Sequence, residues 1–179
     1  MSVPVGTPAT SPRLRPLYPE DLGEVTHLNN LASPAVPTQT VEEMSDLVDL
    51  CDMAVVAEQD GEVMGFLLGV EPGRPYQSEN YRFFESQGVP HFYIDRVVLA
   101  EPARGRGFGR ELYREVFRQA ALRGYQRVTC EVNLNPPNPA SLAFHEAMGF
   151  APVGVQATKG GSVTVQLLEA PVTAAGDRV

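Results

Sequence analysis

The most constraining feature of the sequence is a glycine-rich turn between an apolar run and a long amphipathic segment. Val97, Val98 and Leu99 indicate a strand that is buried on both faces. Residues 104–109, Arg-Gly-Arg-Gly-Phe-Gly, follow this strand, and residues 108–123 then repeat apolar side chains every four positions, as an amphipathic helix does. Alternating glycines allow a sharp turn and a close approach to a ligand, because they have no Cβ. The order strand, turn, helix predicts an anion site where the helix begins.

At the start of such a helix, unpaired N–H groups meet the positive end of the helix dipole, an arrangement suited to phosphate. Spacing separates three patterns that use these parts. A P-loop requires lysine and then serine or threonine after its last glycine, where this chain has Arg110 and Glu111. A dinucleotide fingerprint requires a small residue in place of Arg110, although Glu131 lies at a suitable distance beyond it. Both patterns fit poorly, and a turn that binds nothing is the simplest alternative.

The third pattern is R-x-x-G-x-G, which Arg104, Gly107 and Gly109 satisfy. With this pattern the chain resembles the GNAT superfamily of acyl-CoA-dependent N-acetyltransferases. A second motif of that superfamily, N-x-x-A-x-x-x-Y-x-x-x-G-F, is similar to residues 138–150, although His145 stands at the usual tyrosine position. The two motifs occur in the expected order and separation, and the resemblance extends over residues 13–169.

The chain also resembles a less-studied branch of the superfamily, which carries Tyr-x-Ser-x-Asn-Tyr before a Tyr-x-Asp-Arg strand. These segments are residues 76–81 and 93–96 here. The resemblance implies that the glycine-rich turn cradles the pyrophosphate of coenzyme A, while the preceding strand holds pantetheine and polarises the acyl carbonyl. The residues to which it assigns cofactor binding are Val97, Val98, Leu99, Arg104, Gly105, Arg106, Gly107, Phe108, Gly109, Arg110 and Asn138.

The order of the expected strands and helices, together with the resemblance, predicts an α/β protein of the α+β type with a GNAT fold. We expect a mixed sheet of about six to seven strands flanked by about four helices. The parallel strands 91–99 and 127–132, joined across the helix, splay apart and leave the acyl-CoA cleft at their carboxyl ends. The other expected strands are 13–17, 53–58, 62–70, 151–158 and 162–168, and the other expected helices are 19–31, 38–50 and 139–148.

Composition bounds the class of protein. With 179 residues and 43% hydrophobic content we expect a single domain over residues 13–169, between flexible tails at 1–12 and 170–179. A net charge of −8 argues against a nucleic-acid surface and favours cationic substrates, and no apolar run approaches a membrane span. Cys51 and Cys130 lack metal-binding spacing, so we expect reduced thiols, a cytoplasmic location and no metal.

The acceptor site is less constrained. Loops after the first helix commonly line it in the GNAT family, which points to Asn29 and Asn30. The aromatic insert at 72–90 is either a substrate wall or a short helix that caps the core with Phe83 and Phe84. The side chains that we assign to substrate binding are Asn29, Asn30, Tyr76, Tyr81, Tyr93 and Glu131.

Acetyl transfer to an amine requires a base for the amine and a proton for the departing thiolate. The family uses direct attack without a covalent enzyme intermediate, so the cysteines are expected to be core residues. His145 is our candidate acid, since imidazolium donates a proton near neutral pH, and the alternative is a histidine without a role. Asp95 leads as the base, ahead of Glu131, His91 and Tyr93, but an ion pair with Arg96 is an equal possibility.

Two functions from different classes therefore stand. The first is an N-acetyltransferase that transfers an acetyl group from acetyl-CoA to a small-molecule or peptide amine. The second is a non-catalytic acyl-CoA-binding or sensor domain on the same scaffold, which the replaced tyrosine at His145 keeps open. Dinucleotide binding requires that Arg110 be tolerated where a small residue belongs. Pairing through the edge of the last hairpin makes a homodimer plausible.

Overall fold

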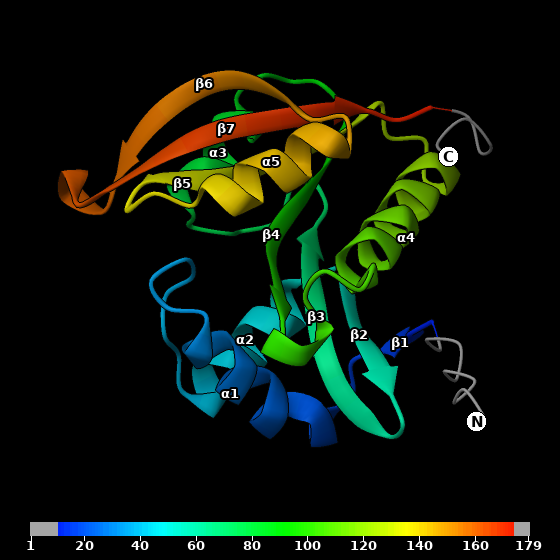
Figure 1. Cartoon of the computed structure of the whole chain (residues 1–179). Helices are drawn as coiled ribbons and strands as arrows, with labels where there is room; N and C mark the ends of the chain where they lie inside the picture. Colours follow the sequence, from blue (N-terminus) through cyan, green and yellow to red (C-terminus); the bar gives the residue numbers. More distant parts are fainter. Residues whose placement is uncertain (1–10, 174–179) are drawn as a thin grey trace, which may run out of the picture.

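The computed structural model describes residues 11–173, which form one seven-stranded mixed sheet in the order β1-β2-β3-β4-β5-β7-β6 (Figure 1). The strands are β1 (Arg13–Pro16), β2 (Met53–Gln59), β3 (Glu62–Val70), β4 (His91–Leu99), β5 (Arg127–Asn135), β6 (Ala151–Thr158) and β7 (Val163–Pro171). The helices are α1 (Leu22–Leu31), α2 (Val41–Leu50), α3 (Glu79–Glu85), α4 (Phe108–Leu122) and α5 (Pro139–Ala147). This architecture confirms the predicted mixed sheet of about six to seven strands, and five helices flank it where we expected about four.

The single parallel pairing in the described sheet joins β4 and β5, and it is short. It extends from His91 opposite Arg127 to Tyr93 opposite Thr129. Beyond this point the two strands part, so that from Ile94 to Leu99 β4 is paired with β3 alone. One backbone edge of β4 therefore has N–H and C=O groups available to a ligand. The predicted splay between the two parallel strands is confirmed.

Local sequence explains where the main elements begin and turn. Asp60 and Gly61, at φ 54° and 83°, make the primed turn that the β2–β3 hairpin requires. Helix α2 begins after Thr40, whose hydroxyl accepts from the N–H of Glu43 in a capping box. Gly107, at φ 87°, precedes helix α4 in the left-handed conformation that glycine adopts without strain.

Helices cover both faces of the sheet (Figure 1). On one face, α4 buries its apolar stripe, including Phe108, Leu112 and Val116, against strands β2 to β5. On the other face, α1 and α2 pack Val25 and Met44 against β2, β3 and β4. Successive β4 side chains alternate between these two faces, so the strand is apolar on both, as its sequence predicts.

Two differences from the expected elements concern their extent. The insert contains helix α3, and its Phe84 is fully buried between strands β3, β4 and β7, as in the core-capping alternative. Strand β7 extends to Pro171, so Ala170 and Pro171 are paired in the sheet where we expected a tail. The expected tails otherwise fall largely on residues 1–10 and 174–179, which lie outside the described residues.

Candidate active site

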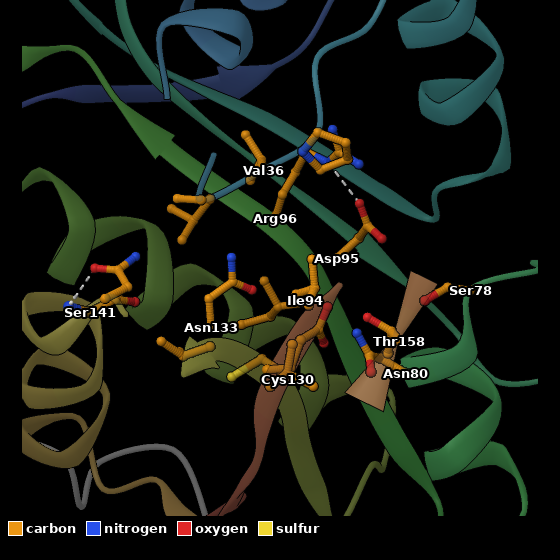
Figure 2. A pocket seen from close by; sticks show the side chains of 18 of the residues that line it. Val36, Ser78, Asn80, Ile94, Asp95, Arg96, Cys130, Asn133, Ser141 and Thr158 are labelled. Atoms are coloured by element: carbon orange, nitrogen blue, oxygen red, sulfur yellow. Dashed lines mark hydrogen bonds and ion pairs between the residues drawn. The ribbon is translucent and has the colours of Figure 1, made fainter. Parts of the chain in front are cut away.

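A cavity of about 470 Å³ lies where β4 and β5 part (Figure 2). Its floor is formed by residues of these two strands, among them Ile94 and Cys130. One wall is residues 34–37, between α1 and α2, and another is residues 76–80, from the insert. Helices α4 and α5 contribute Tyr113, Ser141 and His145, together with Asn138, the N-cap of α5. The β6–β7 hairpin contributes Thr158, Lys159, Val163 and Val165.

The glycine-rich turn precedes α4, and its residues are outside the set that lines the cavity. Gly105 and Gly107 both have positive φ, 69° and 87°, and a Cβ at either position would meet no protein atom within 4 Å. The N–H groups of the first three residues of α4, at 108–110, precede the first helical bond, which Glu111 makes to the carbonyl of Gly107. The turn thus has open space above free donors, the geometry of an anion site.

The predicted cofactor residues divide into four groups. Val97 and Asn138 line the cavity, although the Asn138 side chain also caps α5 by accepting from the N–H of Ser141 at 3.3 Å. Val98 packs on the opposite face of the sheet, so only its backbone is available to the cleft. Leu99 lies under the turn, 3.5 Å from the position a Cβ of Gly109 would occupy. Of the turn residues, Phe108 and Gly109 are buried. The exposed ones are Arg104, Gly105, Arg106, Gly107 and Arg110.

Glu131 is the carboxyl group on the cavity wall with the most perturbed environment. Its two oxygens accept from the hydroxyl of Tyr93 at 2.9 and 2.7 Å, and Asn80 also hydrogen-bonds to it. Desolvation by burial raises the pKa of Glu131 to about 8, and the charge of Asp95 acts in the same direction. A carboxyl group with this pKa is matched to proton transfer at neutral pH.

His145 is buried next to Ser141, which lies at one end of the cavity in Figure 2, and both of its ring nitrogens are engaged. Nδ1 donates to the carbonyl of Ser141 at 2.7 Å, and Nε2 lies 2.6 Å from the hydroxyl of Tyr113. Because Nδ1 carries the hydrogen of the neutral ring, Nε2 accepts from the phenol. Burial lowers the pKa of His145 and raises that of Tyr113 well above its usual value. Both residues line the cavity, so the acidic hydrogen at this end belongs to the phenol.

Asp95, our leading base, lies on the cavity wall but is held on both sides. Its Oδ2 accepts from Nε of Arg96 at 2.8 Å, and its Oδ1 accepts from the hydroxyl of Tyr76. The structure therefore favours the ion-pair alternative for Asp95, because its carboxylate is paired with the buried guanidinium of Arg96.

The remaining expected acceptor residues lie around the cavity rather than in it, with Tyr76 as the exception. Asn29 is buried and binds Arg96, while Asn30 accepts from the backbone of Gln39 at 2.9 Å. Tyr93 supports Glu131 from beneath. Tyr81 belongs to the core cluster under α3, and its hydroxyl donates to the carbonyl of Glu71 at 2.8 Å, so the structure corrects our placement of Tyr81 at the substrate.

Three other expectations concern groups outside the reaction. His91 is buried between Thr129 and Glu85 at the start of β4, away from the cavity lining. Cys51 and Cys130 are free thiols, and burial raises the pKa of both, which opposes a nucleophilic role. Within residues 11–173, no three His, Cys, Asp or Glu side chains are grouped so that they would hold a metal ion. In the same range no helix has the length and apolar character needed to cross a membrane.

Sequence reasoning missed Tyr113, Asn80 and Ser141. Tyr113 follows Leu112 in the apolar stripe of α4 and reads as a core residue, which it also is, since its ring packs against Phe144 and Phe150. Its contact with His145 joins residues 32 positions apart in two different helices, and no local pattern marks it.

Comparison with known proteins finds acetyltransferases of similar sequence and fold. The sequence model of the Acetyltransferase (GNAT) family matches residues 22–150. An L-2,4-diaminobutyric acid acetyltransferase from Nocardia farcinica is 28% identical over 111 residues, which are 62% of this chain and 49% of that protein. The match thus spans about half the length of that relative.

Solved structures share the fold. Naa20 from Chaetomium thermophilum, crystallised with a bisubstrate analogue, superposes with a TM-score of 0.69 at 24% identity, covering 89% of this chain and 86% of that one. A chain of the NatC complex bound to Gag peptide and CoA superposes with a TM-score of 0.69 at 14% identity, covering 92% of this chain and 100% of that one. At these identities the likeness concerns the fold.

Proposed function

Because this chain belongs to the acetyltransferase (GNAT) family, we propose that it transfers the acetyl group of acetyl-CoA to a primary amine. The acceptor is a small molecule, an amino acid or a peptide N-terminus, and attack is direct, in a ternary complex. The observation that carries this proposal is the cavity between β4 and β5, which is lined both by a carboxyl group of raised pKa and by a phenol–imidazole pair.

The acyl donor is acetyl-CoA, consistent with family membership and with the CoA in the NatC structure. Its pyrophosphate is bound by the free N–H groups of residues 108–110, next to the positive end of the α4 dipole. The exposed Arg104, Arg106 and Arg110 add positive charge there. The unpaired edge of β4 over residues 94–99 holds pantetheine and orients the thioester carbonyl.

The acceptor amine enters between residues 34–37 and 76–80 and reaches Glu131. We assign the role of base to Glu131 rather than to Asp95, since burial raises the pKa of Glu131 to about 8, whereas Asp95 is held in an ion pair with Arg96. The amine must lose its proton before it attacks. A carboxylate whose conjugate acid has a pKa of about 8 is a stronger base than an ordinary carboxylate, so it can accept this proton. The net charge of −8 and the acidic cavity wall favour an acceptor that arrives as a cation.

We assign the proton that the departing thiolate takes to the hydroxyl of Tyr113, which becomes a phenolate as the thiol forms. His145, the acid that the sequence suggested, orients this hydroxyl through Nε2 and does not supply the proton itself, because its neutral ring carries its hydrogen on Nδ1. The alternative function, a non-catalytic acyl-CoA sensor, is favoured by one observation: neither ring nitrogen of His145 is free to serve as a direct donor.

Measurement of free-thiol release from acetyl-CoA across a panel of amines and peptide N-termini, with product masses, tests the proposal. Release that requires an amine and yields a product heavier by one acetyl group supports it. Tight coenzyme A binding without release for any acceptor would identify the sensor instead.

Location and assembly are part of the proposal. The free thiols of Cys51 and Cys130 suit the reducing cytoplasm. The edge strand β6 carries an exposed Val155, and a homodimer would pair two such edges.

A further inference from the structure

Two adjacent buried charges occupy an irregular point in β4. The register with β3 passes from Arg96 opposite Leu68 to Ile94 opposite Gly69, which leaves Asp95 as the extra residue of a β-bulge. Side chains of successive strand residues normally lie on opposite faces. The bulge instead brings the two charged side chains together at 2.8 Å, where Arg96 is 6% and Asp95 5% exposed.

These two residues are the centre of a chain of hydrogen bonds that joins the walls of the acceptor cavity. On one side, the Arg96 guanidinium donates to Oδ1 of Asn29 at 2.9 Å, and Nδ2 of Asn29 donates to the carbonyl of Pro37 at 2.9 Å. On the other side, the Tyr76 hydroxyl donates to Asp95. Pro37 and Tyr76 both line the cavity. In Figure 2, Arg96 and Asp95 are drawn between Val36 of one wall and Ser78 and Asn80 of the other.

The chemistry of this chain favours a fixed geometry. A guanidinium presents donors in a rigid plane, and that of Arg96 reaches Asp95, Asn29 and also Oε1 of Gln39 at 3.2 Å. A buried ion pair adds little net stability, but losing one partner leaves the other charge uncompensated, so the arrangement strongly disfavours a change in spacing. Nothing in acetyl transfer requires these groups to exchange protons.

We propose that the Asp95–Arg96 pair is a positioning element that sets the separation of the cavity walls at residues 34–37 and 76–80, and thereby the acceptors that fit. This inference rests on the proposed function. It assigns specificity to two residues outside the coenzyme A turn, and it predicts that loosening either connection changes acceptor selection without weakening the acyl donor.

Two variants loosen one connection each. Tyr76→Phe retains the ring and removes the hydroxyl that binds Asp95. Arg96→Lys retains the charge but cannot reach Asp95, Asn29 and Gln39 together. Matched controls lie away from the cavity lining: the hydroxyl of Tyr125 binds Glu71, and Arg15 binds Asp21 and Glu58, which gives Tyr125→Phe and Arg15→Lys.

The readouts are KM and kcat for 2,4-diaminobutyrate and for a tetrapeptide N-terminus, the acetyl-CoA affinity, and the melting temperature. For both test variants, kcat/KM for the better parental acceptor falls about tenfold, mainly through KM, as expected for one lost hydrogen bond to a charged group. The ratio between the two acceptors changes, while acetyl-CoA affinity stays at the parental value. The two control variants keep the parental ratio.

An unchanged acceptor ratio in Tyr76→Phe overturns the proposal, and so does an equal loss for both acceptors that the controls reproduce. Should Arg96→Lys fail to fold, Tyr76→Phe decides alone. If the parent releases no thiol with any amine, the proposed function fails. Calorimetric binding of the same amines to the complex of the protein with coenzyme A then tests whether the pair controls which amines fit between the walls. The proposal that the Asp95–Arg96 pair sets the separation of the walls is rejected if Tyr76→Phe binds the amines as the parent does. It is also rejected if the parent binds no amine.

Discussion

The hydroxyl oxygen of Tyr113 lies 2.6 Å from Nε2 of His145, and the other ring nitrogen of that histidine is bound to the carbonyl of Ser141 at 2.7 Å. The imidazole is thereby fixed in orientation and in tautomer. Since burial lowers the pKa of His145, the ring is neutral at pH 7 and holds no hydrogen on Nε2. Any proton delivered from this end of the cavity therefore involves the phenol.

The first prediction concerns this pair. Tyr113→Phe keeps the ring between Phe144 and Phe150 but removes the hydroxyl, and His145→Phe removes its acceptor. Each change is expected to lower kcat by about 10²-fold or more, the usual range for general acid catalysis. Because the two residues act as a unit, the double variant loses little more than either single one. Steady-state kinetics with acetyl-CoA and the best acceptor measures this.

A third variant distinguishes catalysis from packing. His145→Tyr combined with Tyr113→Phe moves the phenol to α5, and it recovers part of the lost kcat if a donor is what the site needs. If Tyr113→Phe and His145→Phe both turn over at the parental rate, the pair is structural and the assignment is wrong.

The second prediction concerns Glu131 and pH. Its pKa of about 8 in the fold lies above the ordinary value of about 4.3, so the folded state binds more protons than the unfolded state between these two pH values. The contribution of this group to stability is therefore complete below about pH 4, declines as pH rises toward 8, and is then constant. Glu131→Gln removes this decline. Urea unfolding at intervals from pH 5 to 9 compares the two slopes.

The same carboxyl group must be ionised to accept the proton of the amine. Parental kcat/KM therefore rises with pH up to about 8, and Glu131→Gln lowers kcat/KM and abolishes this limb. An unaltered profile in the variant would assign the limb to the acceptor amine and return the search for the base to other groups.

What the sequence predicts well is backbone geometry that a few residues impose. Asp60 and Gly61 fix the hairpin, and Gly105 and Gly107 fix the turn before α4, because positive φ is accessible to glycine and tolerated by aspartate. The right-handed crossover then makes β4 and β5 parallel neighbours. The fold and the backbone geometry of the turn follow from these local signals.

What the sequence does not predict is which polar side chains meet across the cavity. Tyr76 and Asp95 are 19 residues apart, and Arg96 and Asn29 are 67 apart, so their contacts depend on how the insert and α1 dock on the sheet. The bulge that turns Asp95 toward Arg96 leaves no sign in the apolar pattern of the strand. A charged residue in that strand reads equally well as a base or as an ion pair, and the structure favours the second reading.

The third prediction tests the corrected position of Tyr81. Its ring is 1% exposed and packs on Tyr76 and Tyr93, with centroids 5.5 Å away in each case. Tyr81→Ala is expected to lower the free energy of unfolding by about 3 kcal/mol or more, as for other buried aromatic side chains. At a low temperature at which Tyr81→Ala is folded, we expect it to rank the acceptors by kcat/KM in the same order as the parent. A changed ranking with parental stability would restore Tyr81 to the substrate wall.

The final prediction addresses the acyl donor through two glycines with the same backbone constraint. Gly107 precedes α4 at φ +87°, and Gly124 follows it at φ +77°, and a Cβ at either position meets no protein atom within 4 Å. Replacing either residue with valine strains the backbone by about 1 to 2 kcal/mol. At Gly107 the new side chain also occupies the space above the free N–H groups of residues 108–110, where we place the pyrophosphate.

Coenzyme A at about 100 times its Kd is expected to stabilise the parent by about 2.7 kcal/mol. Gly124→Val is less stable than the parent without ligand but retains this stabilisation by coenzyme A. Gly107→Val loses the stabilisation, because the Cβ and methyl groups exclude the phosphates from the helix terminus. Thermal unfolding with and without coenzyme A, at equal protein concentration, separates the shared strain from the specific loss. An equal ligand-induced shift in both folded variants would show that the pyrophosphate binds elsewhere.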